Sequence, residues 1–388
     1  MKILSVSHIF PNRVLPNYGV FIKERLKALS KLVETNIISP VPSFPFINLF
    51  DKYKNYNKIP YIDFLDSLSV CYPKFFLFPK YFNFLDGYFY FHSTNSFFSE
   101  QILKKNIDLL DFHWVYPDAY AGLKWAKKFN KKIVVTIRGN ESICYYENSL
   151  RKKLLINTLQ NVDHIISVSN ELERKVIEEY GIKKDRVTVI PNGIEPEKFK
   201  SIDKIMARKY CGLDKDKKYI LSLSRLSHEK GLEYLFEAFA FLKVNNAELV
   251  VVGDGPLNEA LHNMSLKLGI RNKVNFIGSV SHDETINWYN AADVYCLPSL
   301  WEGCPNVIIE SLACGTPVVS TKVGGIPDLV PNDDYGYLVP AGESGDLAVA
   351  LNRALNKNWD CQKIAHYGSR NTWDNVADRV VEVFHKVL

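Results

Sequence analysis

Short runs of β-branched and aliphatic residues alternate with amphipathic stretches along the whole chain, and this alternation constrains the fold more than any other feature. The first half carries the runs KILSVSH, ETNIIS, IDLLDFHW, KKIVVTIRG and HIISVS. The second half carries KYILSLSR, AELVVVGD, KVNFIG, ADVYCLPS, TPVVST and YGYLVP. Nearly continuous apolar strands separated by helical patterns are typical of parallel sheets covered on both faces. We therefore predict an α/β protein.

The amphipathic stretches between these runs predict the helices. The clearest candidates are residues 19–32, 171–180, 232–242, 257–268 and 306–313. A last helix is expected over residues 372–387, where the apolar stripe consists of Val376, Val380, Val381 and Phe384. Strands that alternate with helices in this way predict two successive Rossmann-like domains.

The chain of 388 residues is long enough for two domains. The turn cluster Pro191-Asn192-Gly193 directly follows the strand-like run RVTVI and marks the expected boundary. We therefore expect an N-terminal domain over residues 1–192 and a C-terminal domain over residues 193–370. Residues 371–388 would form a closing helix.

Several classes of protein are disfavoured by the sequence. The chain has no run of about eighteen uninterrupted apolar residues, so no membrane span is predicted. The N-terminal MKILSVSHIFPN lacks a small-residue cleavage site and is interpreted as a strand rather than a signal peptide. The seven cysteines include no Cys-x-x-Cys pair, which argues against a disulfide scaffold and a zinc ribbon. We expect a soluble, cytoplasmic protein.

Charge and aromatic residues are distributed unevenly. Residues 1–190 contain 27 Lys and Arg against 18 Asp and Glu, whereas the remainder is mildly acidic. Residues 44–98 contain 20 Phe and Tyr, interspersed with Lys52, Lys54, Lys58, Lys74 and Lys80. Aromatic rings beside lysines are typical of a membrane interface, but the same rings would also suit a domain core, and both readings stay open. Nucleic-acid binding is disfavoured because the basic residues are dispersed.

The stretch PSLWEGCPNVIIESLACGTPVVS, residues 298–320, carries the strongest chemical signal. A buried strand ends there, a loop with Glu302 follows, and Pro305 stands where a helix begins. Glu310 lies inside that otherwise apolar helix. Two carboxylates at this spacing suit one ligand with hydroxyls at two ends, such as the hexose and the ribose of a nucleotide sugar. The helix N-terminus would then face the diphosphate.

Two cations are predicted at the same sheet edge. Arg225 ends the run KYILSLSR, and Lys230 follows shortly after it. Ligands of open α/β sheets bind outside the carboxyl ends of the strands, where an Arg and a Lys can neutralise a diphosphate without a metal ion. The pair Asp214-x-Asp216 resembles a metal-binding pattern, but it precedes a strand and is predicted to form an exposed turn.

Weaker signals come from the first half. His113 and Arg138 each end a strand-like run, and Asn140 follows Arg138 closely. A histidine in such a place is either a ligand contact or a hydrogen-bonded core residue. Gly19 precedes the first helix, where it would either admit a phosphate close to the backbone or simply cap the helix.

Together these motifs resemble the retaining glycosyltransferases of family 4. The resemblance runs in order through essentially the whole chain, from the loop Tyr18-Gly-Val-Phe21 and the segment His113-Trp-Val-Tyr-Pro-Asp118 to the motif Glu302-x7-Glu310. It implies the GT-B fold, in which two Rossmann-like domains face each other across a cleft. It also implies that the C-terminal helix crosses back to the N-terminal domain.

The resemblance implies roles for individual residues. The diphosphate would be held by Arg225 and Lys230, with Gly19 close to it. The donor hexose would be bound by Glu302, by the backbone of Gly303 and Cys304, and by His113. The rest of the donor would contact Val280, Asn306, Val307 and, at the ribose, Glu310. Catalytic roles are expected for His113, Arg225, Lys230 and Glu302. The acceptor side would include Tyr18, Arg138 and Asn140, although the chain departs from the family pattern around these positions.

The implied activity is the transfer of a hexose from a UDP- or GDP-linked donor to a saccharide acceptor, with retention and without a metal or cofactor. The basic half and the aromatic–lysine stretch suggest a lipid-linked acceptor at the inner face of the cytoplasmic membrane, in cell-surface polysaccharide synthesis. A sugar-nucleotide epimerase and a catalytically silent nucleotide-sugar-binding subunit are the alternatives. Donor conversion without an acceptor would identify the epimerase.

Overall fold

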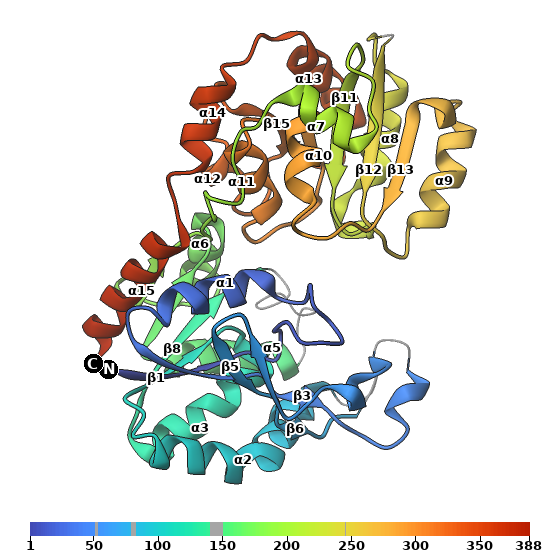
Figure 1. Ribbon diagram of the computed structural model, residues 1–388. Coiled ribbons are helices and arrows are strands. Elements are labelled where there is room, and N and C mark those ends of the chain that lie inside the picture. The colour runs from blue at the N-terminus through green and yellow to red at the C-terminus, as the bar shows by residue number, and fades with distance from the viewer. Residues whose placement is uncertain (51–52, 79–82, 140–149, 245) are drawn as a thin grey trace. The chain divides into compact units, whose positions relative to one another are not determined.

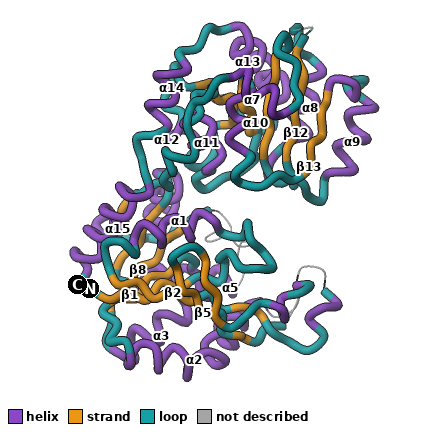
Figure 2. The backbone as a smooth tube through the Cα atoms, viewed as in Figure 1, coloured by secondary structure: helices purple, strands orange, loops and turns teal. Residues whose placement is uncertain are grey.

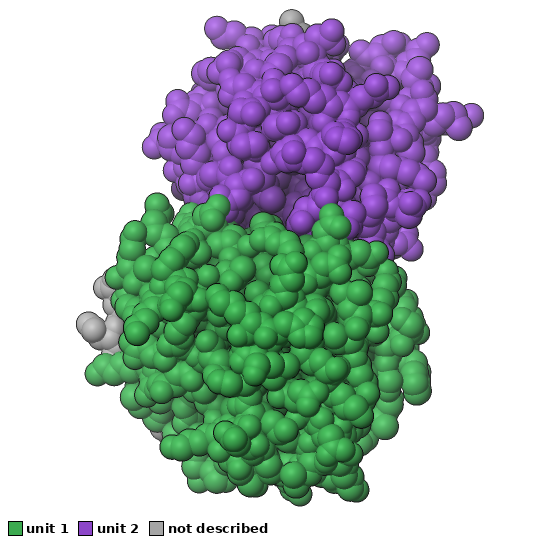
Figure 3. Space-filling view, turned by 90° about the vertical axis from the view of Figure 1, so that its left-hand side faces the viewer, with its two compact units in different colours: residues 1–192, 373–388 green, residues 193–372 purple. Residues whose placement is uncertain are grey.

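The structure is a computed structural model that describes residues 1–50, 53–78, 83–139, 150–244 and 246–388. The chain divides into two compact units, shown in Figure 3. Unit 1 comprises residues 1–192 together with 373–388, and unit 2 comprises residues 193–372. The first boundary is where the sequence analysis placed it, and the second lies slightly beyond the expected 370/371. The final helix belongs to unit 1, as the resemblance implied.

Unit 1 is built on an eight-stranded sheet with the order β10-β9-β8-β7-β1-β2-β5-β4. These strands are β1 (Lys2–Val6), β2 (Glu34–Ile38), β4 (Ile62–Leu65), β5 (Leu68–Cys71), β7 (Leu109–Phe112), β8 (Lys132–Ile137), β9 (His164–Ser167) and β10 (Val187–Val189). Neighbouring strands are parallel, except that β4 pairs with β5 in the antiparallel sense. Two short strands, β3 (Val41–Pro42) and β6 (Lys74–Phe75), pair separately.

Helices cover both faces of this sheet (Figure 1). They are α1 (Val20–Leu29), α2 (Asp86–Lys104), α3 (Tyr120–Phe129), α5 (Leu150–Asn161), α6 (Asn170–Glu178) and α15 (Trp373–Val387). α15 lies against α1, because its stripe of Val376, Val380 and Phe384 joins the apolar core of unit 1. Because both sheet faces are covered, all four residues of β7 are buried.

Unit 2 contains a parallel sheet with the order β13-β12-β11-β14-β15-β16. The strands are β11 (Lys218–Leu223), β12 (Ala247–Val252), β13 (Val274–Gly278), β14 (Val294–Leu297), β15 (Val318–Thr321) and β16 (Gly336–Val339). The helices are α7 (Lys204–Cys211), α8 (Leu232–Ala240), α9 (Asn258–Lys267), α10 (Thr285–Ala291), α11 (Asn306–Ala313), α12 (Ile326–Leu329), α13 (Ser344–Asn356) and α14 (Cys361–Gly368). In Figure 2 the strands of this unit lie between its helices. The prediction of two Rossmann-like α/β units is confirmed.

Each sheet has a point at which the strand order reverses. In unit 2 the chain builds outward from β11 through β12 and β13, then returns to build β14, β15 and β16 on the other side. In unit 1 the corresponding reversal lies between β1 and β7. A crevice forms outside the carboxyl ends of the strands at such a point, and it is the usual place for a ligand in open α/β sheets.

The aromatic-rich stretch is divided between core and surface. Its buried rings include Phe44, Tyr72, Phe75, Tyr90 and Phe98. Its exposed side chains include Phe46, Leu49, Tyr61, Ile62, Phe64, Phe78 and Tyr88. The core reading therefore holds for the buried rings, and the membrane reading of the exposed side chains stays a prediction. Among the described residues, the helices are too short or too polar to cross a lipid bilayer.

Candidate active site

The loops that follow β11 and β14 flank the strand-order reversal of unit 2, and they bring a cation and a carboxylate together. Lys230 Nζ donates a hydrogen bond of 2.6 Å to Glu302 Oε1, and Ser299 Oγ donates one of 2.7 Å to the same oxygen. The Lys230 side chain is 21% exposed and that of Glu302 is 9% exposed. Two residues singled out for donor binding thus form one ion pair in a largely buried setting.

Glycines allow these loops to approach each other closely. Gly231 has a φ of +60°, and a β-carbon there would lie 2.3 Å from the carbonyl oxygen of Pro298. Gly324, after β15, has a φ of +57°, and its β-carbon would lie 2.1 Å from the carbonyl oxygen of Glu302. Larger residues would therefore strain the backbone and push the loops apart. The positions of Lys230 and Glu302 depend on this backbone-to-backbone packing.

Arg225 lies in the same loop as Lys230. It is exposed just beyond β11. Burial would raise the pKa of Glu229, but hydrogen bonds from Ser227 and the backbone, together with the charges of Lys230 and Arg225, lower that pKa. Both cations therefore lie close enough to Glu229, at the carboxyl end of β11, to act on its carboxylate.

The loop after β14 carries Glu302 and leads into α11. The free backbone N–H groups of the first turn of α11 lie at this edge of the sheet. Gly303 and Cys304 are buried, and Asn306 and Val307 are half-buried in the first turn. Pro305 occupies the N-cap position and supplies no side-chain cap. A helix N-terminus of this kind favours an anion. Val280 is half-buried in the loop after β13, at the same sheet edge.

Glu310 is buried in α11 and is held by two side chains. Tyr289 donates its hydroxyl hydrogen to Glu310 Oε2 at 2.8 Å, and His282 Nε2 lies 3.1 Å from Oε1. Burial, and then the charge of Glu310, raises the pKa of Tyr289 well above its usual value, so its hydroxyl stays protonated. Each carboxylate oxygen has a second lone pair and can also accept a hydrogen bond from a ribose hydroxyl.

Lys198 fixes the tautomer of His282. Its ammonium lies 2.8 Å from His282 Nδ1. An ammonium can only donate, so Nδ1 must accept, and the ring hydrogen must then be on Nε2, which donates it to Glu310. No sequence motif singled out Lys198, His282 or Tyr289. Only the position of His282, just after the loop of β13, offered a signal.

The expected site residues of unit 1 form a separate group. Gly19 is the N-cap residue of α1 with a φ of +77°, and the preceding Tyr18 is 39% exposed. His113 is completely buried, with Nδ1 2.9 Å from Arg138 Nη2 and Nε2 3.1 Å from Asp111 Oδ2. Arg138 is buried as well, and Asn140 lies outside the described residues. The ring of His113 is therefore fully buried in this structure, and its contact with the donor sugar stays a prediction.

Burial controls the protonation of His113. Desolvation is the largest effect, and it outweighs the attraction of Asp111 and lowers the pKa of His113 to about 4. Arg138 can only donate, so Nδ1 of the ring accepts and Nε2 carries the hydrogen that faces Asp111. His113 is thus a neutral residue that links a buried arginine to a buried carboxylate.

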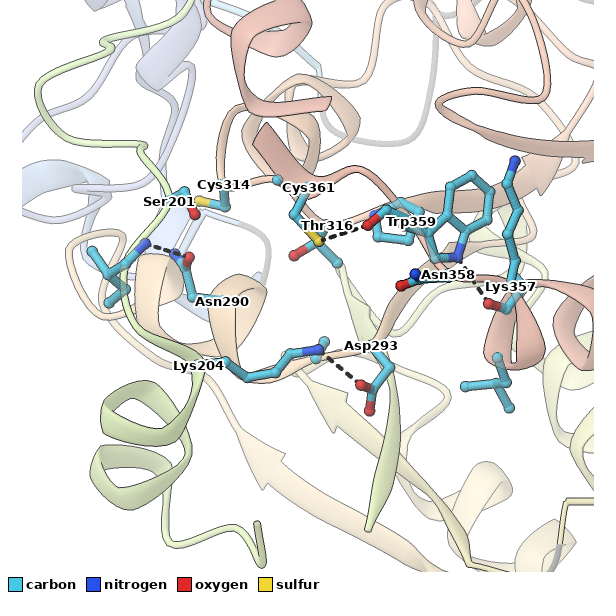
Figure 4. Close-up of a pocket in the computed structure, with 16 residues that line it drawn as sticks. Ser201, Lys204, Asn290, Asp293, Cys314, Thr316, Lys357, Asn358, Trp359 and Cys361 are labelled. Carbon is cyan, nitrogen blue, oxygen red and sulfur yellow. Dashed lines mark hydrogen bonds and ion pairs between the residues drawn. The ribbon is translucent and has the colours of Figure 1, made fainter. Parts of the chain in front are cut away.

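A cavity of about 300 Å³ lies elsewhere in unit 2 (Figure 4). Its lining includes Asp293 and Thr316, which precede β14 and β15, as well as Lys204 and Trp359. Lys204 Nζ pairs with Asp293 Oδ1 at 2.8 Å. Because the amino ends of parallel strands lie opposite their carboxyl ends, this cavity is distinct from the Lys230–Glu302 site. The expected turn Asp214-x-Asp216 is exposed at this same edge, before β11.

Comparisons with known proteins agree with this geometry. The family model for "Glycosyl transferases group 1" matches residues 203–371, and the model for "Glycosyltransferase Family 4" matches residues 60–198. The chain belongs to glycosyltransferase family 4. The resemblance seen in the sequence motifs is thereby confirmed.

Curated relatives match part of this family 4 chain. An uncharacterized glycosyltransferase of Methanocaldococcus jannaschii is 33% identical over 231 residues, which cover 57% of the chain and 59% of that protein. The phosphatidylinositol N-acetylglucosaminyltransferase GPI3 subunit of Saccharomyces cerevisiae is 31% identical over 242 residues, which cover 61% of the chain and 53% of that protein. The matched region thus spans little more than half the length of either relative.

Solved structures establish the GT-B fold of the family 4 chain. A sucrose-phosphate synthase from Thermosynechococcus elongatus has a TM-score of 0.80 at 19% identity, covering 100% of the chain and 99% of that protein. HepE of Anabaena, in complex with UDP, has a TM-score of 0.75 at 20% identity and covers both chains completely. The expected fold class is confirmed.

Proposed function

We propose that this chain is a retaining, metal-independent hexosyltransferase that uses a UDP- or GDP-linked donor and a saccharide acceptor. The observation that carries the proposal is the pairing of Lys230 with Glu302 at the strand-order reversal of unit 2. Lys230 and Arg225 supply charge for a diphosphate, and Glu302 can accept hydrogen bonds from hexose hydroxyls. HepE is described in complex with UDP and with UDP-glucose, which supports a nucleotide-sugar donor.

The reaction breaks the bond between the anomeric carbon and the diphosphate oxygen, which leaves with the electron pair. Lys230, Arg225 and the N-terminus of α11 stabilise the charge on that oxygen. The acceptor oxygen forms its bond to the anomeric carbon on the same face, and its proton passes to the departing phosphate. Glu310, held by His282 and Tyr289, anchors the ribose. The residues proposed to stabilise the charge on the leaving group all belong to unit 2.

Binding of the donor is tested by a melting-temperature screen against nucleotides and nucleotide sugars. A ligand that binds only the folded chain raises its melting temperature, so we expect UDP or GDP derivatives to do so. The bound donor is then incubated with and without saccharides, and the anomeric configuration of the product is read by NMR. Failure of every nucleotide to shift melting would contradict the proposal. Conversion of the sugar without acceptor would indicate an epimerase.

Replacement of His282 by alanine is expected to raise the KM for the donor about tenfold while kcat stays close to wild type. The ring donates to Glu310, the proposed ribose anchor, so its loss removes one hydrogen bond to a charged group, about 1.4 kcal/mol, from ground-state and transition-state binding alike. Steady-state kinetics with varied donor measure the effect. His366→Ala, exposed on α14, is the control. An equal fall in kcat would contradict a purely orienting role.

We further propose that the acceptor is lipid-linked and that unit 1 contacts an anionic membrane during cell-surface polysaccharide synthesis. Phe46 is 80% exposed and Phe64 is 73% exposed, and Lys54, Lys58 and Lys74 are exposed in the same stretch. Phe46 also has a φ of +60°, an uncommon backbone conformation for a bulky residue, and it presents its ring to solvent. Exposed apolar side chains beside lysines suit a lipid headgroup region.

Co-sedimentation with lipid vesicles tests this contact. We expect wild-type protein to pellet with vesicles that contain phosphatidylglycerol and to remain largely in solution with neutral vesicles. The double variant Phe46→Ser, Phe64→Ser should lose most of this binding. Phe241→Ser, which replaces a 66% exposed residue of unit 2, is the matched control. Binding that is negligible, or unaffected by anionic lipid, would exclude the membrane proposal.

A further inference from the structure

The cavity of about 300 Å³ in unit 2 is a second place for a ligand, at the sheet edge opposite the candidate active site. Residues just before β14 and β15, among them Asp293 and Thr316, line it together with the end of α13. Lys204, the first residue of α7, and Trp359, between α13 and α14, lie on opposite sides of it in Figure 4. Because helices and strand ends form most of these walls, the cavity is present before a ligand binds.

One side of the cavity carries more positive than negative charge. Lys204 Nζ donates to Asp293 Oδ1 at 2.8 Å, and Arg208 Nη2 donates to Asp293 Oδ2 at 2.7 Å. Arg208 is buried, and its other nitrogens donate to backbone carbonyl oxygens. Among the described residues, Lys204 pairs with no other carboxylate. An ammonium has three hydrogens, so Lys204 is held in place by one of them and has two left for an anion.

The other side of the cavity is aromatic. Trp359 is half-buried, and its Nε1 donates to the carbonyl oxygen of Ala354 at 2.8 Å. The ammonium of Lys357 lies 3.9 Å from the centroid of the indole ring. These contacts fix the ring and use its one polar atom, so the ring offers the cavity an apolar surface. The exposed amide of Asn358, which also lines the cavity, can exchange hydrogen bonds with hydroxyl groups beside that surface.

We propose that this cavity binds a phosphorylated monosaccharide, with the phosphate on Lys204 and an apolar face of the sugar ring on Trp359. Lysine binds phosphate as a point charge, and a sugar ring combines apolar faces with hydroxyl groups. The cavity volume is at the lower end of the range for small-molecule sites, which suits one phosphorylated ring better than a whole nucleotide sugar. This inference does not depend on the transferase proposal, because the residues that line the cavity are not those expected to bind the donor.

The cavity and the candidate active site are connected but do not share residues. Thr316 Oγ1 donates to the carbonyl oxygen of Tyr289 at 2.7 Å, and the hydroxyl of Tyr289 donates to Glu310 at 2.8 Å. Ligands at the two places therefore contact different residues of the same unit. We expect a sugar phosphate and a nucleotide to bind one chain together, without competition.

Calorimetric titration of the full-length protein with a panel of hexose 1-phosphates and hexose 6-phosphates, with and without UDP, tests the proposal. Inorganic phosphate and unphosphorylated hexoses are titrated separately, and both should bind more weakly than the best hexose phosphate. Lys204→Met leaves Asp293 paired with Arg208 and should weaken binding about tenfold. Trp359→Leu should weaken it as well, through the lost ring contact. Lys209→Met, which replaces an exposed lysine of the same helix, is the matched control and should bind as wild type does.

Failure of every hexose phosphate to bind the wild type would overturn the proposal, as would equal binding by Lys204→Met whose melting temperature shows that it is folded. Equal affinity for inorganic phosphate would contradict the sugar contact. Displacement of the hexose phosphate by UDP would assign it to the candidate active site instead. Binding of UDP is measured on the same samples, so the two proposals are tested separately. Hexose phosphate binding that depends on Lys204, without UDP binding, would contradict the transferase but support the cavity site.

Discussion

Replacement of Lys230 by alanine is expected to lower the kcat of sugar transfer by about a hundredfold. The ammonium donates to Glu302 at 2.6 Å, and the carboxylate side chain is only 9% exposed. In the proposed reaction, the same ammonium stabilises the charge that develops on the departing diphosphate oxygen. A positioned charge at a leaving group contributes roughly a factor of 10² to 10³ to the rate. Steady-state kinetics at saturating donor measure the loss.

The matched control for Lys230 is Lys215→Ala, which removes an exposed lysine before β11, at the other edge of the same sheet. Its kcat should equal that of the wild type. Lys230→Ala also leaves Glu302 with a weaker set of partners, so a lower melting temperature is expected and the assays must be run well below it. Normal transfer by folded Lys230→Ala would show that the lysine does not act on the leaving group.

Acidification from pH 7 to pH 5.5 is expected to destabilise unit 1, mainly through His113. Burial, the largest cause, lowers the pKa of His113 to about 4 in the folded state, whereas an unfolded histidine titrates near 6.5. Between these values the unfolded chain binds more protons, so stability is complete above pH 6.5 and falls as the pH drops. For one such ring, the free energy of unfolding falls by about 1 kcal/mol by pH 5.5. His164, whose pKa burial also lowers to about 4, acts in the same direction.

Urea unfolding of the full chain at several pH values measures this dependence, with separate probes for the two units. His113→Gln removes one titrating ring and should flatten the curve for unit 1. His385→Gln, which alters an exposed histidine, should leave the curve unchanged. Asp111 does not produce the effect in this range, because burial would raise its pKa but His113, Arg25 and Ser5 together lower it. Stability that is constant or rises toward pH 5.5 would contradict the buried neutral state of His113.

Much of the fold follows from local sequence pattern. Each apolar run singled out in the sequence is a strand, because a run such as ADVYCLPS is continuous, short and bounded by polar residues. The hairpin of β4 and β5 was not predicted. In β4, buried Asp63 lies between exposed Ile62 and Phe64, which reverses the usual pattern of apolar residues inside and polar residues outside. Asp63 is buried because Arg13, fifty positions earlier in the sequence, pairs with it.

The site was predictable only where its residues lie next to a recognisable element. Lys230, Glu302 and Glu310 each follow or occupy an element that the pattern identifies. The partners of Glu310 are 28 and 21 residues away from it. No local periodicity links such positions, since they meet only after the strands have found their order in the sheet. Burial of His113 depends in the same way on packing that no single segment determines.

Ile194 donates its backbone N–H to Asn371 at 3.0 Å and bridges Thr372, so the two ends of unit 2 lie next to each other. Unit 2 is therefore one continuous segment inserted into the chain of unit 1, and it can be exchanged as a whole. Exchanging residues 193–372 for the equivalent segment of another family member would replace the unit that carries Lys230 and Glu302 and leave the host core unbroken. Cutting once after residue 192 would instead strip α15 from α1 and expose their shared apolar surface. Recombination at the paired ends is therefore a route to new combinations of the two units.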